Sequence, residues 1–236
     1  MQPTLELLRG MPLLRAVPAT DLAELQVTRV ERERGGCFFH QGDLGDAVYG
    51  IVTGRVRVVK QSPSGREVCL ELLGTGDLIA ALAVMRQIPF PASGVAAEGS
   101  VCVRVSADAF RWLVQRHPWL TTRILEVVSQ RLLDASDSRL SLATEPVETR
   151  LAQVLLKLAE KYAVLQGDSL IFAASLTRQQ LGDLAGTTVE STIRVMSRWT
   201  RDGLLRSSAS RITVTDPSAL RRLAGRCPGD PESRAS

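Results

Sequence analysis

The hydrophobic and polar positions of this chain change their rhythm along its length. Residues 4 to 27 hold short apolar runs broken by Gly10, Pro12 and Pro18, which indicates two short helices. Residues 35 to 106 form short alternating runs with turn residues every eight to twelve positions. That spacing is typical of strands in a small antiparallel barrel or roll. Beyond this region the apolar spacing is that of helices.

The clearest strand pair in the roll is YGIVTGRVRVV with REVCLEL. Valine, isoleucine and leucine alternate with other residues in both runs. The intervening SPSG favours a chain reversal, because serine, proline and glycine suit the backbone angles of a turn. We therefore expect a β-hairpin here.

Two helices are expected after the roll. SADAFRWLVQRH predicts the first, and a longer helix follows Pro118 and runs to about Ala143. Positions in the longer helix follow spacings of 3, 4, 3, 4 and 3, the rhythm of a coiled-coil seam. They are Leu125, Val128, Leu132, Ala135, Arg139 and Leu142. We expect this helix to pair with a second copy of the chain; an amphipathic helix packed on its own roll is the alternative.

The segment TEPVETR, residues 144 to 150, is the expected hinge, since Pro146 suits the first turn of a following helix. That helix, VETRLAQVLLKLAEKYA, is followed by QGD and a short strand, LIFA. The tail CPGDPESRAS is rich in proline, glycine and small polar residues, which predicts disorder.

The stretch SLTRQQLGDLAGTTVESTIRVMSRWTRDGLL carries several helix signals in register. Thr177 with Gln180 three residues later is a capping box, which starts a helix. Gly186 can end that helix at a positive φ, and Thr187 or Thr188 can cap the next one. These signals predict two helices joined by a tight turn.

The second helix of this pair has two faces. Its expected core stripe consists of Thr192, Val195, Met196 and Trp199. The positions that project the other way are Val189, Glu190, Arg194 and Ser197. After Gly203, LLRSSASRITVTD alternates around SSAS, which predicts the β-wing of a winged helix. The expected fold class is therefore α+β: an N-terminal antiparallel β-roll over 1–117, a long dimerisation helix over 118–143 and a winged helix-turn-helix domain over 144–226.

The positive charge lies in the C-terminal part. Residues 1 to 149 hold 16 Lys and Arg against 17 Asp and Glu, whereas residues 150 to 236 hold 13 against 8. An arginine in the major groove can donate two hydrogen bonds to guanine, and a carboxylate can accept one from cytosine. Phosphates would repel a carboxylate that read no base, so Glu190 and Arg194 are candidate base readers; an ordinary surface ion pair is the alternative. Further candidates for DNA contact are Val189 at a base and Thr177, Arg178, Thr188, Ser197, Arg198 and Arg211 at the backbone.

Residues 176 to 194 match the motif L-T-R-x-x-[LI]-[AG]-x-x-x-G-x-[ST]-x-E-[ST]-x-x-R. The chain thereby resembles the CRP/FNR superfamily of bacterial transcription regulators, nearer to its FNR-type and nitric-oxide-regulator members. The resemblance continues through the roll at Gly42, Asp43, Tyr49, Ile51, Gly54, Val56, Val58, Gly65, Gly76 and Asp77. It implies a homodimer on an inverted-repeat operator, with Glu190 and Arg194 at a TGA-like core. Val189 stands where the cyclic-AMP receptor has arginine, and Ile193 differs from the serine of FNR, so the outer bases stay open.

The resemblance also implies an effector pocket in GDLIAALAVMRQIPFPASGVA. In the cyclic-AMP branch a glutamate and an Arg-Ser pair hold the phosphate; here Ala80 and Ala81 occupy the Gly-Glu positions, and Pro91 and Ala92 replace the Arg-Ser pair. A phosphate would enter an apolar site without a cation, at a cost of several kcal/mol. Cyclic AMP bound in the usual way is therefore not expected. The predicted pocket residues are Ala80, Ala81, Leu82, Pro91, Ala92, Ser93, Ala135 and Ser136.

The effector itself is left open. The apolar run also resembles haem-dependent nitric-oxide regulators, but ligation needs histidine or cysteine, and only His40 and His117 are present as histidines. Haem, an unidentified small effector and constitutive DNA binding all stay possible. The four cysteines, Cys37, Cys69, Cys102 and Cys227, form no C-x-x-C pair, so we expect no metal site and no FNR-type iron-sulfur cluster.

Other classes fit less well. A cupin-like enzyme needs clustered histidine and carboxylate ligands, and one histidine in the roll cannot supply them, so we expect no enzyme. Non-specific DNA binding stays as an alternative. The N-terminus lacks a signal-peptide pattern and the longest apolar run, LIAALAVM, is too short for a bilayer. We expect a cytoplasmic protein with no membrane partner, and RNA polymerase as a possible further partner.

Overall fold

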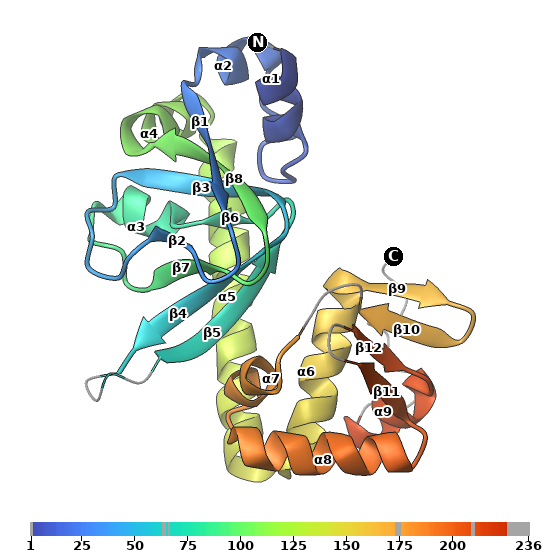
Figure 1. Cartoon of the computed structure of the whole chain (residues 1–236). Helices are drawn as coiled ribbons and strands as arrows, with labels where there is room; N and C mark the ends of the chain where they lie inside the picture. The colour runs from blue at the N-terminus through green and yellow to red at the C-terminus, as the bar shows by residue number, and fades with distance from the viewer. Residues whose placement is uncertain (1, 63–64, 66, 173–175, 209–210, 226–236) are drawn as a thin grey trace. The chain divides into compact units, whose positions relative to one another are not determined.

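The computed structural model describes residues 2–62, 65, 67–172, 176–208 and 211–225 (Figure 1). The predicted C-terminal tail with Cys227 and the tip of the predicted wing lie outside the described residues. Contacts between Cα atoms divide the chain into two compact units, Met1–Leu133 and Asp134–Ser236. The predicted α+β fold is confirmed, with antiparallel sheets in the first unit and helices around a small sheet in the second.

The first unit contains two four-stranded antiparallel sheets, in the orders β1-β8-β3-β6 and β2-β7-β4-β5. The strands are β1 (Val27–Arg32), β2 (Cys37–Phe39), β3 (Ala47–Thr53), β4 (Arg55–Gln61), β5 (Glu67–Gly74), β6 (Leu78–Ile79), β7 (Ser93–Ala96) and β8 (Ser100–Ser106). The helices are α1 (Gln2–Arg9), α2 (Ala19–Glu24), α3 (Ala81–Arg86), α4 (Ala107–Arg116) and α5 (Trp119–Thr144), whose last turns belong to the second unit.

The predicted hairpin is present as β4 and β5, paired from Arg55 with Gly74 to Gln61 with Glu67. The run YGIVTGRVRVV, however, is two strands in different sheets, because the chain bends at Gly54. Gly54 has a φ of +82°, and a Cβ there would overlap Ser100, so only glycine fits. Strand β1 was not predicted, since VTRVER lacks an alternating apolar pattern.

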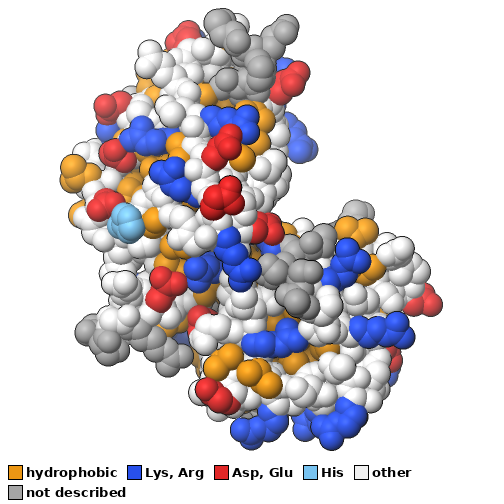
Figure 2. All heavy atoms as spheres, viewed as in Figure 1, with side chains coloured by type: hydrophobic (Ala, Val, Ile, Leu, Met, Phe, Trp, Pro, Cys, Tyr) orange, Lys and Arg blue, Asp and Glu red, His pale blue; other side chains and the backbone are white. Residues whose placement is uncertain are grey.

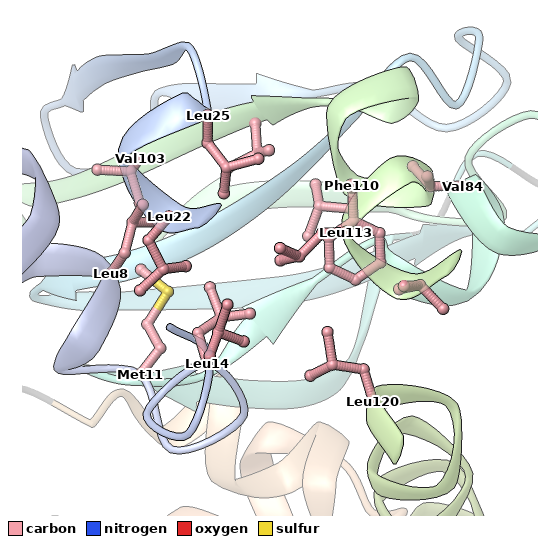
Figure 3. Packing of buried hydrophobic residues seen from close by; sticks show 14 of the residues in the cluster. Leu8, Met11, Leu14, Leu22, Leu25, Val84, Val103, Phe110, Leu113 and Leu120 are labelled. Carbon is pink, nitrogen blue, oxygen red and sulfur yellow. The ribbon is translucent and has the colours of Figure 1, made fainter. Parts of the chain in front are cut away.

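The N-terminal helices complete the core of the first unit. Figure 3 shows side chains from α1, α2 and the loop between them packed with residues of α4 and the start of α5. The members labelled there include Leu8, Met11, Leu14, Leu22, Phe110, Leu113 and Leu120, all at most 2% exposed. A Cβ at Gly50 on β3 would collide with the side chain of Met11, so this glycine leaves space for the loop between α1 and α2. Burial of such large apolar side chains is the main stabilising term.

A buried carboxylate reinforces this attachment. Asp21 on α2 is 5% exposed; it accepts a hydrogen bond from Arg116 Nε at 2.9 Å and lies 2.7 Å from His117 Nε2. The hydrogen bond from Arg116, helped by His117, lowers the pKa of Asp21 below its ordinary value. The network therefore links α2 to the end of α4.

The second unit contains one four-stranded sheet, in the order β11-β12-β10-β9. Its elements are α6 (Val147–Tyr162), β9 (Ala163–Gln166), β10 (Ser169–Phe172), α7 (Arg178–Leu184), α8 (Val189–Arg201), β11 (Leu205–Ser208), β12 (Arg211–Val214) and α9 (Pro217–Leu223). One strand was expected after α6, but the chain forms a hairpin, since AVLQ at the end of the apolar helix run becomes β9. Between α5 and α6 only Glu145 and Pro146 lie outside a helix, so little of the segment 144–150 is irregular.

Candidate nucleic-acid interface and effector cavity

Helices α7 and α8 begin at the predicted caps. Thr177 Oγ1 accepts a hydrogen bond from the Gln180 backbone N–H at 3.1 Å, while Gln180 Oε1 accepts one from the Thr177 N–H at 2.8 Å. Thr188 Oγ1 accepts from the Ser191 N–H at 3.2 Å. Gly186 has a φ of +60°, so it makes the reversal between the helices. The capping box and the tight turn are therefore confirmed.

Helix α8 buries one face and exposes the other. The predicted core stripe of Thr192, Val195, Met196 and Trp199 is buried. Glu190, Arg194 and Ser197 are exposed, and Val189 is half-buried. Lys and Arg side chains gather over α8 along the lower edge of Figure 2. The candidate base readers therefore stand on the open side of a firmly packed helix.

Several predicted backbone contacts already have partners inside the protein. Arg178 Nη2 donates to Ser207 Oγ on β11 at 2.6 Å, and burial lowers the pKa of its guanidinium. The Thr177 and Thr188 hydroxyls serve as helix caps. Ser197 and Arg211 are exposed. The six candidates are thus not equivalent, because Thr177, Arg178 and Thr188 have these structural partners and Arg198 has an ion-pair partner as well.

Glu148 is a contributor that sequence reasoning missed. Its carboxylate accepts a hydrogen bond from Trp199 Nε1 at 2.7 Å and pairs with Arg198 Nη2 at 2.6 Å. It therefore ties α6 to α8 and competes with any phosphate for Arg198. No local pattern could have identified it, since it lies about fifty residues before its partners.

Most of the predicted effector residues line one cavity in the first unit, with a volume of about 280 Å³. Ala80, Ala81, Leu82, Pro91 and Ala92 all contribute to its wall. The other lining residues are Pro12, Leu13, Phe39, Val58, Glu71, Gly76, Asp77, Leu78, Ile79, Ala83, Phe90, Ile124, Val127, Val128 and Arg131. The cavity is therefore predominantly apolar and is bounded by the roll, by α3 and by α5.

The wall of this cavity differs from the expectation at two positions. Ser93 is not among the lining residues, and its Oγ accepts a hydrogen bond from the Gln41 N–H at 2.8 Å, so its place in the site stays a prediction. The wall also includes a positively charged side chain, which was not expected. Arg131 on α5 lines the cavity, with its Nε 3.4 Å from Glu71 Oε1. Arg131 is not recognisable as a wall residue from the sequence, because it lies about forty residues from the run that supplies most of the predicted wall residues. Ala135 and Ser136 lie farther along α5, in the second unit, and their place in the site stays a prediction.

Neither histidine is among the residues that line the cavity, and no cysteine or methionine is. His117 contacts Asp21, and His40 Nδ1 lies 3.5 Å from Cys37 Sγ. Burial raises the pKa of the Cys102 thiol to about 12. The cavity wall thus offers none of the usual axial ligands of haem.

The predicted seam of α5 is largely open in a single chain. Leu125 is 62% exposed and Leu132 66% exposed, while Val128 is half-buried at the cavity. Leu142 is less free, because its side chain touches the Cα of Gly186 so closely that a Cβ could not fit between them. Among the described residues, no helix is long and apolar enough to cross a membrane.

Each of the two units contains a region that matches a known protein family. A model of the cyclic nucleotide-binding domain matches residues 29–117, and one of the Crp-like helix-turn-helix domain matches residues 149–223. The CRP-like cAMP-activated global transcriptional regulator of Mycobacterium tuberculosis is 26% identical over 93% of this chain and 99% of its own length. The transcriptional regulatory protein btr of Bordetella pertussis is 30% identical over 92% and 88%.

A solved structure shares the fold. FixK2 from Bradyrhizobium japonicum superimposes with a TM-score of 0.75 at 21% identity, covering 87% of this chain and all of that one. Because 87% of this chain is covered, the shared fold includes elements of both units.

Proposed function

The chain belongs to the CRP/FNR family of DNA-binding transcription regulators, and from this premise we propose that it acts as a homodimer on an inverted-repeat operator with a TGA-like core in each half-site. Glu190 and Arg194 read the core, the arginine through guanine and the carboxylate through a cytosine amino group. The observation that carries this assignment is their exposure on α8, whose opposite face is buried.

The bases outside the core are assigned to an apolar flank of the same helix. Val189 is half-buried and Ile193 is 48% exposed one turn later. Branched apolar side chains at a groove contact the C5-methyl group of thymine. Ser197 and Arg211 contact phosphates, and Arg198 does so when it leaves Glu148; Thr177, Thr188 and Arg178 act through helix caps and the wing.

Dimerisation is assigned to α5. Leu125 and Leu132 expose most of their side chains, which supports a seam with a second copy over packing on the chain's own roll. Joining two recognition helices raises affinity through effective concentration, and half-sites one helical turn apart, about 34 Å, suit such a dimer. We place the protein in the cytoplasm, with RNA polymerase as a further partner.

The cavity is assigned to a small, predominantly apolar effector. Glu71 neutralises Arg131, and Asp77 adds a second carboxylate to the wall, which disfavours a phosphate bound in the manner of cyclic AMP. Ile124, Val127 and Val128 form part of the wall on α5. An effector therefore acts by changing how α5 packs against the roll, and constitutive binding results if the apolar wall is stable without a ligand.

Selection of bound duplexes from a random pool tests this function, with the visible absorption spectrum of the purified protein recorded in parallel. We expect an enriched inverted repeat with TGA-like half-sites. Enrichment of no motif, with an affinity that simply follows salt, would identify non-specific DNA binding instead. A Soret band would identify the alternative of a haem-based gas sensor and would overturn the assignment of the cavity.

A further inference from the structure

Arg150, on the first turn of α6, contacts two other helix ends at once. Its Nη1 donates to the backbone oxygen of Glu145 at 2.7 Å, directly after α5. Its Nε donates to the oxygen of Ala185 at 2.9 Å and its Nη2 to that of Gly186 at 3.3 Å, directly after α7. One guanidinium therefore bonds the end of α5 to the turn of the helix-turn-helix.

These acceptors are groups that a helix cannot satisfy by itself. The last carbonyl groups of a helix have no partner within it and carry partial negative charge, so a cation there is favourable. Arg150 serves the C-terminal ends of α5 and α7 together. Its planar fork suits several acceptors in fixed directions, which the ammonium of lysine, a compact point charge, does not reproduce.

The contacts lie next to the start of the recognition helix. Gly186 is two residues from Thr188, the N-cap of α8. The turn is also closed by a hydrogen bond from the Thr187 N–H to the Gly182 oxygen at 2.8 Å. Leu142, on the last turns of α5, also packs against Gly186. The contacts of Arg150 and Leu142 thus connect the N-terminus of α8 to the end of α5.

We propose that Arg150 is a positioning residue for operator recognition, which fixes the start of α8 relative to the dimer helix and so sets the spacing between half-sites that the homodimer accepts. This inference rests on the proposed function. A rigid joint restricts the dimer to one separation, because one added base pair moves a half-site along the axis by about 3.4 Å and also rotates it. Without the Arg150 bonds each α8 can shift, and neighbouring spacings become acceptable.

The test uses the full-length protein and duplexes carrying the selected half-sites with the selected spacer, one base pair fewer or one more. Fluorescence anisotropy gives the ratio of dissociation constants between altered and selected spacers. For the unmodified protein we expect a large ratio. Arg150→Met should lower that ratio about tenfold, the scale of one lost charge-assisted hydrogen bond, and Arg150→Lys should lower it in the same direction.

Lys161→Met is the matched control, since it removes a positive charge from an exposed position on the same helix and should leave the ratio unchanged. Both affinities are measured on one protein sample, so partial unfolding of Arg150→Met cancels in the ratio, and Arg150→Lys provides a milder variant. A lower melting temperature with an unaltered ratio would mean a merely structural role and overturn the inference. So would an unmodified protein that accepts all three spacers equally. If the selection yields no inverted repeat, the proposed function itself is overturned.

Discussion

The exposed face of α8, with Glu190 and Arg194, and the cavity beside α3 differ in the surroundings of their side chains. Glu190 and Arg194 stand in solvent, and the helix that carries them is held from behind by Trp199 and its neighbours. The cavity wall is apolar, and its one cation is already paired with Glu71. In the proposed function, the exposed face of α8 would discriminate between bases by hydrogen bonds, whereas the cavity would select an effector by its shape and by the absence of unpaired charge.

The largest effect is expected from a change that prevents dimerisation, because the exposed face of α8 is then present only once per molecule. Leu132→Glu places charges against each other in the middle of the seam, so we expect monomers and a loss of operator affinity of roughly a hundredfold or more, because the two half-sites are no longer bound together. Sedimentation and anisotropy titration measure the two changes. Leu44→Glu, at another strongly exposed leucine, is the control; a persistent dimer in Leu132→Glu would show that the seam is assigned wrongly.

Removing a base-reading group should be the next largest change. Arg194→Ala should weaken binding to the selected operator by roughly 1–3 kcal/mol and relax the preference at one base pair. Arg211→Ala, at a proposed phosphate contact, should instead weaken all sequences alike and lower the salt dependence by about one ion. Titrations on operator and random duplexes distinguish them. An equal loss on both duplexes for Arg194→Ala contradicts its role in reading bases.

The affinity of the cavity for an anionic ligand should depend on the charge of Glu71. Glu71→Gln releases Arg131 from its ion pair, so an anionic apolar dye, anilinonaphthalene sulfonate, should bind more tightly, by about twofold to fivefold for a pair this exposed. Fluorescence titration measures the change. Glu67→Gln, which breaks the Arg57 pair elsewhere on β5, is the control, and the same gain in both variants would mean that the dye binds outside the cavity.

The smallest expected effect tests the apolar flank of α8. Replacing single outer thymines of the operator by uracil removes only a methyl group, so affinity should fall about threefold to fourfold at the position that Ile193 contacts. With Ile193→Ser the same replacement should have no effect. If the losses from the base change and the protein change simply add, Ile193 does not touch that methyl group.

The sequence was informative wherever a structure is decided within a few residues. Thr177 and Gln180 cap each other across three positions, and the period of α8 separates buried Trp199 from exposed Arg194. Family resemblance added the proposal that Glu190 and Arg194 read bases, which spacing alone does not give. The same reasoning placed the strands of the β4–β5 hairpin, since their turn is local.

The parts that were missed depend on residues distant in the chain. Arg131 reaches the cavity from α5, and Arg150 meets the helix-turn-helix turn 35 residues later. Strand β1 is recognisable only from its pairing with β8. The backbone hydrogen bonds of that pairing stabilise the strand, whereas its largely polar side chains give no sequence signal for it. Such features require the tertiary arrangement, since their sequence neighbourhood is ordinary.

The packing of the N-terminal helices has a practical consequence for shortening this protein. Similarity to the cyclic nucleotide-binding domain begins at residue 29, yet Leu8, Met11 and Leu22 belong to the same buried cluster as Phe110. A truncation at residue 29 would leave an open trough beside Gly50 and uncover the apolar side of α4. The point where a family likeness starts is therefore a poor place to cut, because here the physical domain extends past it.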